Sequence, residues 1–294
     1  MSDPTPTPEL KTYDGNCHCG AFKFTARLPE LTSVNYCNCS YCSKKGYRWL
    51  FPRECTVLKG EGTLKEYKFA TGSRSHQFCG ICGTTVLAER QGYPLAINAN
   101  ALDVPAAVIL DAKVGVYDGK AKDPQYIPAK FAGTEPTAEI EDSRTYYGGC
   151  HCGAVTVAMK TGGDLVDHAP EGILECDCSI CLKHGTILTY PLKSALSVHA
   201  SSPSALTTYT FGRKFNEHKF CSNCGVYIYI HKKEHIDEED WRKFKGDASQ
   251  DRWRRTQPVN LRVIEGVDWE VLREKGLIER GDWSKMEPKY VVPE

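Results

Sequence analysis

One cysteine pattern occurs twice in this chain, and it constrains the fold more than any other feature. Fifteen of the 294 residues are cysteines, and all but Cys55 fall into three motifs that have the same order in each half. The motifs are G-x-C-H-C-G-A at 15–21 and 148–154, C-x-C-S-x-C at 37–42 and 176–181, and H-x-F-C-x-x-C-G at 76–83 and 218–225. The offset grows only from 133 residues at the first motif to 142 at the third, which predicts two copies of one fold.

Short strands are predicted around the motifs, because the flanking segments alternate in polarity or are rich in branched residues and begin after glycines. They are expected at 21–25 and 154–158, at 64–69 and 206–211, and at 84–88 and 226–230. Helical periodicity is scarce, so each copy should be mainly β.

The repeat predicts the domain organisation. We expect a disordered tail at 1–12, a first domain at 13–117, a surface linker at 118–145, a second domain at 146–270 and a C-terminal extension at 271–294. The second domain carries an insertion at 231–255 with eight basic and seven acidic residues, which predicts a solvated helical face. A lid or partner-docking element is the alternative, with Trp241, Phe244 and Trp253 as its apolar contacts.

Charge and composition exclude several classes of protein. Lysine and arginine number 37, as do aspartate and glutamate, so no net charge favours nucleic acid or an anionic membrane. No window is apolar enough for a membrane span, and the first ten residues lack the features of a signal peptide. We therefore expect a cytoplasmic protein, with the nucleus as a second compartment, in which clustered thiols bind metal rather than form disulfides.

Two pairs of cysteines in each copy have the spacing of a structural zinc site. Four thiolates saturate a tetrahedral zinc ion, so such a site contributes folding energy and no chemistry. The predicted ligands are Cys17, Cys19, Cys79 and Cys82 in the first copy and Cys150, Cys152, Cys221 and Cys224 in the second. The lone Cys55 is expected to be a partly buried small hydrophobe.

Three cysteines per copy remain, namely Cys37, Cys39 and Cys42, and Cys176, Cys178 and Cys181. Three protein ligands leave one tetrahedral position of a zinc ion for water or substrate. Three thiolates also reduce the acidity of the metal, so a soft ligand such as a substrate thiolate is favoured there. A bound thiolate could form or break a bond to an electrophilic carbon. The sequence thus predicts up to four zinc ions per chain, two per domain.

A histidine in the fourth position would instead make these sites structural. His18 and His151 recur between two cysteines, but alternation along an extended C-H-C segment places each opposite its neighbouring sulfurs. His76 and His218 also recur and remain candidates, whereas His184 is replaced by Lys45 in the first copy.

Other polar residues lie within or near the C-x-C-S-x-C motifs. Ser40 and Ser179 are expected to hydrogen-bond the cysteine clusters. Lys44, Lys45, Arg48 and Lys183 could meet the carboxylates of a thiol such as glutathione, although exposed cations are more often plain surface.

The three motifs, in this order and twice, resemble the glutathione-dependent formaldehyde-activating enzyme family, also called the CENP-V/GFA domain. The resemblance implies two tandem Mss4-like, or β-tent, zinc-binding domains. It also implies that Cys37, Cys39, Cys42, Cys176, Cys178 and Cys181 are catalytic. The activity implied is that of a carbon-sulfur lyase which joins glutathione and formaldehyde to S-(hydroxymethyl)glutathione.

Two functions remain open. In the first, the chain is a zinc-dependent lyase whose partners are a small thiol such as glutathione and an aldehyde-type carbon compound. In the second, it is a non-catalytic interaction module in which zinc only stabilises a surface. The sequence leaves the oligomeric state undetermined.

Overall fold

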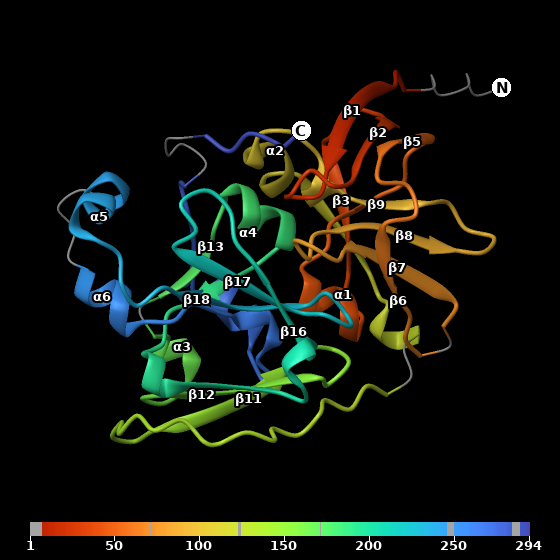
Figure 1. Cartoon of the computed structure of the whole chain (residues 1–294). Coiled ribbons are helices and arrows are strands. Elements are labelled where there is room, and N and C mark those ends of the chain that lie inside the picture. The colour runs from red at the N-terminus through yellow and green to blue at the C-terminus, as the bar shows by residue number, and fades with distance from the viewer. Residues whose placement is uncertain (1–7, 71, 123–124, 171, 246–249, 284–288) are drawn as a thin grey trace.

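The computed structural model describes residues 8–294 except 71, 123–124, 171, 246–249 and 284–288, and the side chains of 244 and 245 also lie outside the description. The fold is mainly β and consists of two similar halves, which confirms the predicted fold class and repeat (Figure 1). No helix in the described part of the chain is both long and apolar enough to span a membrane.

The N-terminal half precedes residue 144. Its strands are β1 (Lys11–Asn16), β2 (Lys23–Leu28), β3 (Ser33–Cys37), β4 (Trp49–Leu50), β5 (Glu54–Lys59), β6 (Leu64–Tyr67), β7 (Arg74–Cys79), β8 (Thr85–Arg90), β9 (Ala96–Asn98) and β10 (Lys113–Tyr117). Its helices are α1 (Ser40–Lys45) and α2 (Ala106–Leu110), with the 3-10 turns η1 (Ala99–Ala101) and η2 (Lys120–Lys122).

The C-terminal half begins at residue 144. Its strands are β11 (Arg144–Gly149), β12 (Val155–Thr161), β13 (Ile173–Glu175), β14 (Leu188–Thr189), β15 (Leu196–Ala200), β16 (Leu206–Tyr209), β17 (Asn216–Cys221), β18 (Tyr227–Lys232), β19 (Val259–Asn260) and β20 (Ile278–Arg280). Its helices are α3 (Leu165–His168), α4 (Ser179–His184), α5 (Glu238–Lys245), α6 (Gln250–Arg255) and α7 (Trp269–Glu274), and its 3-10 turns are η3 (Lys193–Ala195), η4 (Pro203–Ala205) and η5 (Leu261–Val263).

The sheets of the two halves correspond strand for strand. The three-stranded sheet β1-β2-β5 matches β11-β12-β15, and the seven-stranded sheet β10-β3-β4-β9-β8-β7-β6 matches β20-β13-β14-β19-β18-β17-β16. Each seven-stranded sheet has a parallel pair at one edge, β3 with β10 and β13 with β20. Because β20 belongs to this sheet, residues 278–280 of the expected C-terminal extension are part of the second copy.

The segments outside the motifs differ in part from simple tails and linkers. Strand β1 begins at Lys11, inside the segment 1–12 that was expected to be a tail, and residues 1–7 of that segment lie outside the described chain. In the linker, the Ala138 amide donates to the carbonyl of Ser194, and Lys160 donates to the carbonyls of Pro136 and Ala138. The linker is therefore hydrogen-bonded to the C-terminal half.

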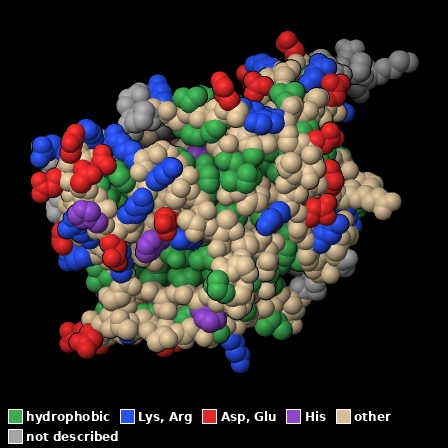
Figure 2. Space-filling model, viewed as in Figure 1, with side chains coloured by type: hydrophobic (Ala, Val, Ile, Leu, Met, Phe, Trp, Pro, Cys, Tyr) green, Lys and Arg blue, Asp and Glu red, His purple; other side chains and the backbone are tan. Residues whose placement is uncertain are grey.

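The insertion forms the helices α5 and α6. Trp241 is buried against Phe215 and Ile236, and Trp253 packs on this small cluster, whereas the side chain of Phe244 lies outside the described part. Charged side chains of both signs cover the exposed side of this region, on the left of Figure 2. The i,i+4 ion pairs Lys243–Glu239 and Arg255–Asp251 belong to it.

The two halves do not bury separate cores. One buried cluster joins Tyr41, Cys42 and Tyr47 of the N-terminal half to Cys224 and Ile228 of the C-terminal half. The other joins the N-terminal core to a second set of C-terminal residues, which includes Cys176, Ile180, Cys181, Tyr209 and Phe220. Helices α1 and α4 thus lie in the interface between the halves, where α1 contacts η5 and α4 contacts η1.

The halves also approach each other closely at the ends of these two helices. Gly46 caps α1 at φ 62° and Gly185 caps α4 at φ 60°, both in the left-handed region. A Cβ atom on Gly46 would meet the carbonyl oxygen of Gly185 at 2.2 Å, and one on Gly185 would meet that of Gly46 at 2.4 Å. Only glycine satisfies both the conformation and the space at these positions.

Candidate metal centres

The structure brings the fourteen motif cysteines together as four clusters, and the sulfur atoms of each lie within 4.8 Å of one another. Two clusters have four cysteines: Cys17, Cys19, Cys79 and Cys82, and Cys150, Cys152, Cys221 and Cys224. Two have three: Cys37, Cys39 and Cys42, and Cys176, Cys178 and Cys181. Cys55 lies in β5, half-buried and outside the clusters.

The four-cysteine clusters have the dimensions of a tetrahedral metal site. The sulfur atoms of Cys17 and Cys19, and of Cys19 and Cys79, lie 3.6 Å apart, as do the corresponding pairs in the C-terminal half. Four sulfurs at about 2.3 Å from a zinc ion would be separated by about 3.8 Å, whereas a disulfide bond is about 2 Å long. The donor set therefore fits a metal ion, and none of the fifteen cysteines forms a disulfide bond.

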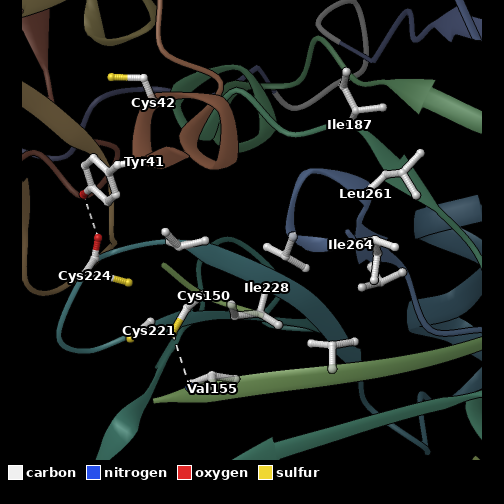
Figure 3. Packing of buried hydrophobic residues seen from close by; sticks show 14 of the residues in the cluster. Tyr41, Cys42, Cys150, Val155, Ile187, Cys221, Cys224, Ile228, Leu261 and Ile264 are labelled. Atoms are coloured by element: carbon white, nitrogen blue, oxygen red, sulfur yellow. Dashed lines mark hydrogen bonds between the residues drawn. The ribbon is translucent and has the colours of Figure 1, made fainter. Parts of the chain in front are cut away.

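Backbone amides complete these clusters. The Phe22 amide donates to the sulfur of Cys17 at 3.2 Å, and the Val155 amide donates to that of Cys150 at the same distance (Figure 3). Such bonds partly neutralise the charge of a thiolate. They arise where the chain turns from the first motif into strands β2 and β12.

Each three-cysteine cluster is built on the first turn of a short helix. In the N-terminal half, Cys37 ends β3, Cys39 is the N-cap of α1 and accepts a hydrogen bond from the Cys42 amide at 3.4 Å, and Cys42 lies within the helix. Cys39 and Cys42 are buried and Cys37 is half-buried. In the C-terminal half, Cys176 follows β13, Cys178 is the N-cap of α4 without a side-chain cap bond, and Cys181 lies within the helix.

The histidine beside each three-cysteine cluster comes from the opposite half. Nε2 of His151 lies 3.0 Å from Oγ of Ser40, and its Nδ1 lies 2.7 Å from the hydroxyl of Tyr67. Both ring nitrogens of His151 are therefore engaged, and in the described chain no histidine, aspartate or glutamate joins Cys37, Cys39 and Cys42 in a ligand group.

The same arrangement occurs in the other direction. Nε2 of His18 lies 3.0 Å from Oγ of Ser179, and its Nδ1 lies 2.9 Å from the hydroxyl of Tyr209. Burial lowers the pKa of His18 to about 3, so its ring is neutral. Neither histidine belongs to the four-cysteine cluster that flanks it in sequence. The two serines, which were expected to bond the cysteines, have these histidines as partners.

Aromatic rings surround the two histidines, and sequence reasoning missed them as site residues. Tyr126 stacks on His151 with ring centres 4.6 Å apart, and Tyr290 stacks on His18 at 4.3 Å. Phe69 contacts His151 at 4.7 Å and Phe211 contacts His18 at 4.4 Å. The signals in the sequence are a repeated Y-x-F at 67–69 and 209–211 and a repeated P-x-Y at 124–126 and 288–290.

Two further histidines are buried close to these aromatic groups. Burial lowers the pKa of His76 to about 3 and that of His218 to about 4, so both rings are neutral. Nδ1 of His76 and Nε2 of His218 have no hydrogen-bond partner. Neither ring joins a cysteine cluster as a possible ligand.

The lysines near the three-cysteine motifs are not exposed surface residues, although an exposed position was the more common expectation for them. Lys44, Lys45 and Lys183 are all buried. Lys183 donates to the carbonyls of Asn16 and Ala101, and Arg48 forms an ion pair of 2.8 Å with Glu175. These four cations therefore have protein partners across the interface.

The fold and these clusters define a tandem β protein with four cysteine clusters that could each hold a metal ion. The family model of the glutathione-dependent formaldehyde-activating enzyme matches residues 12–116 and again residues 145–240. The chain belongs to this family and contains its domain twice. A solved structure of a Rhodobacter sphaeroides protein is also similar, with 27% identity over 46% of this chain and 98% of that chain and a TM-score of 0.33.

Proposed function

We propose that this protein is a zinc-dependent carbon-sulfur lyase of the S-(hydroxymethyl)glutathione synthase type. The observation that carries the proposal is the ligand number of the clusters. Two clusters offer four sulfurs, and two offer three with no fourth histidine or carboxylate ligand in the described chain. This is the difference between a closed structural zinc site and one that can accept a substrate. The family membership supports a thiol and formaldehyde as substrates.

The proposed reaction joins a thiol to an aldehyde. The sulfur lone pair forms a bond to the carbonyl carbon, the π electrons of the carbonyl move to oxygen, and the proton lost by the thiol ends on that oxygen. The product from glutathione and formaldehyde is S-(hydroxymethyl)glutathione, with no change in overall oxidation state. The reverse reaction breaks the carbon-sulfur bond.

Cys37, Cys39 and Cys42, with their counterparts Cys176, Cys178 and Cys181, would hold the zinc ions. Bound there, zinc would keep a substrate thiol in its nucleophilic thiolate form near neutral pH. Tyr67 and Phe69 contact Tyr41, the residue before Cys42, and also His151, and such rings exclude water from a site. The four-cysteine clusters would hold structural zinc, which gives four zinc ions per chain.

The test is a comparison of cysteine variants. We expect the double variant Cys39→Ser and Cys178→Ser to lose the catalysed formation of S-(hydroxymethyl)glutathione, measured by exchange NMR, and to retain two zinc ions. Cys55→Ser is the matched control, because its thiol lies outside every cluster, and it should keep the full rate. A double variant as fast as the parent would refute the proposal.

A cobalt-substituted protein separates this function from an interaction module. We expect the spectra of the two three-cysteine sites to change when glutathione is added, because a new sulfur ligand alters the ligand field. Spectra that respond to no small thiol would favour the module. The charged α5–α6 surface would then be the first place to seek a protein partner.

A further inference from the structure

The helix that carries each three-cysteine motif is held at both ends by the opposite half. At the start of α1, Ser40 is hydrogen-bonded to His151, which lies between two cysteines of the C-terminal four-cysteine cluster. At its end, Lys44 donates to the carbonyl of Gly149, the residue before Cys150, at 3.2 Å. Lys44 also forms a close ion pair with Glu265.

Two further contacts connect α1 with the same cluster. The hydroxyl of Tyr41 donates to the carbonyl of Cys224 at 2.7 Å (Figure 3). Lys45 donates to the carbonyl of Gly225, the residue after Cys224. Helix α1, which contains Cys42 and is capped by Cys39, thus rests on the backbone of the C-terminal four-cysteine cluster.

The contacts of α4 with the N-terminal half are the reciprocal set. Ser179 is hydrogen-bonded to His18, and Lys183 donates to the carbonyl of Asn16, the residue before Cys17. Nε2 of His184 lies 2.9 Å from the carbonyl oxygen of Cys82. His184 in α4 and Tyr41 in α1 each have a counterpart of a different residue type in the other helix. Each helix nevertheless contacts a four-cysteine cluster of the opposite half.

We propose that each four-cysteine cluster positions the three-cysteine site of the opposite half, so that the four metal centres form two crossed pairs. His18 and His151 are positioning residues in this arrangement. They fix the serine next to the second cysteine of the motif and, with it, the spacing of the three sulfurs. The proposal goes beyond the proposed function, because it concerns metal retention in the resting protein and requires no lyase activity.

Cadmium NMR tests this pairing site by site. The full chain loaded with ¹¹³Cd gives one resonance per metal centre, and single Cys→Ser variants assign them. We expect His151→Phe to broaden or shift the resonance of the Cys37-Cys39-Cys42 site and to raise its rate of metal loss to EDTA about tenfold or more. The resonance of the Cys176-Cys178-Cys181 site should stay unchanged. His18→Phe should do the reverse, so each variant is the matched control of the other.

Two more variants keep the test decisive if a phenylalanine is not tolerated. His151→Gln retains a side-chain hydrogen bond to Ser40 and should restore most of the metal retention. Lys44→Met, at the far end of α1, should weaken the same site as His151→Phe does. The proposal is overturned if either histidine variant affects the three-cysteine site of its own half instead, or if none of these variants changes metal retention at the opposite site.

Discussion

The imidazole of His151 lies 3.0 Å from the hydroxyl of Ser40, although 111 residues separate them in the chain. His151 stands between two ligands of one cysteine cluster, and Ser40 stands between two ligands of another. The contact therefore joins a cluster of four cysteines in one half to a cluster of three in the other. His18 and Ser179 repeat the relationship in the opposite direction, also at 3.0 Å.

We expect Gly46→Ala to destabilise the protein strongly. The new Cβ would meet a backbone oxygen of Gly185 at 2.2 Å, and the left-handed φ adds strain. The matched control is Gly62→Ala, which has a similar positive φ of 72° but nothing within 4 Å of its Cβ. Urea unfolding should show a loss at least about 2 kcal/mol larger for Gly46→Ala than for the control. If both variants lost the same free energy of unfolding, the two halves would be able to move apart easily at Gly46.

We expect Tyr41→Phe to cost about 1 to 2 kcal/mol of unfolding free energy. The change removes the bond to the Cys224 carbonyl and leaves that buried oxygen without this donor. Tyr147→Phe is the control, because its hydroxyl bonds Glu135 at an exposed site and should contribute little. A Tyr41→Phe protein as stable as the parent would show that this bond between the halves is energetically neutral.

We expect part of the acid sensitivity of the protein to come from His76. Burial holds its pKa near 3 in the folded state, whereas an unfolded histidine has a pKa of about 6.5. The unfolded chain therefore binds a proton that the folded one does not, and stability falls as pH drops below about 6.5. Between pH 7.5 and pH 5 the loss is about 2 kcal/mol.

The measurement is a series of urea unfolding curves across this pH range. His76→Phe should flatten the decline by that amount, whereas His235→Gln, at an exposed position, should leave the slope as it is. If the stability of His76→Phe falls with decreasing pH as steeply as that of the parent, the buried His76 is not the cause of the acid sensitivity.

We expect metal removal to unfold the chain. Structural zinc sites contribute on the order of 10 kcal/mol to folding at neutral pH, which is comparable to the whole stability of a typical protein. Far-UV circular dichroism after treatment with a chelator should show lost strand signal, and Cys82→Ser should behave similarly. Cys39→Ser should keep the folded spectrum, because it leaves both four-cysteine clusters intact. Apo protein with the unfolding temperature of the parent would contradict this division of roles.

The sequence predicted the repeat, the mainly β class and the grouping of all fourteen motif cysteines. These follow from local patterns, since C-x-C and C-x-x-C spacings bring sulfurs together within one turn and strands follow from alternation. It also predicted that His18 and His151 would turn away from the sulfurs of their own clusters, which the structure shows.

Two parts of the site were not predicted. Tyr126 and Tyr290 lie in segments that read as linker and extension, because a single aromatic residue among prolines has no periodicity to indicate its position. Lys44 and Lys183 were expected at the surface because lysines are seldom buried, yet each reaches backbone carbonyls of the other half. Such partners carry no sequence signal, since every residue has a carbonyl.

By itself, then, the sequence determined the two copies of the fold and the grouping of the cysteines into four clusters, because those cysteines are close in the chain or belong to repeated motifs. Only the tertiary structure decided that the copies share their cores and that His18 and His151 are hydrogen-bonded to serines of the opposite half. That outcome depends on how two surfaces pack. The packing involves residues more than a hundred positions apart, so no local sequence pattern indicates it.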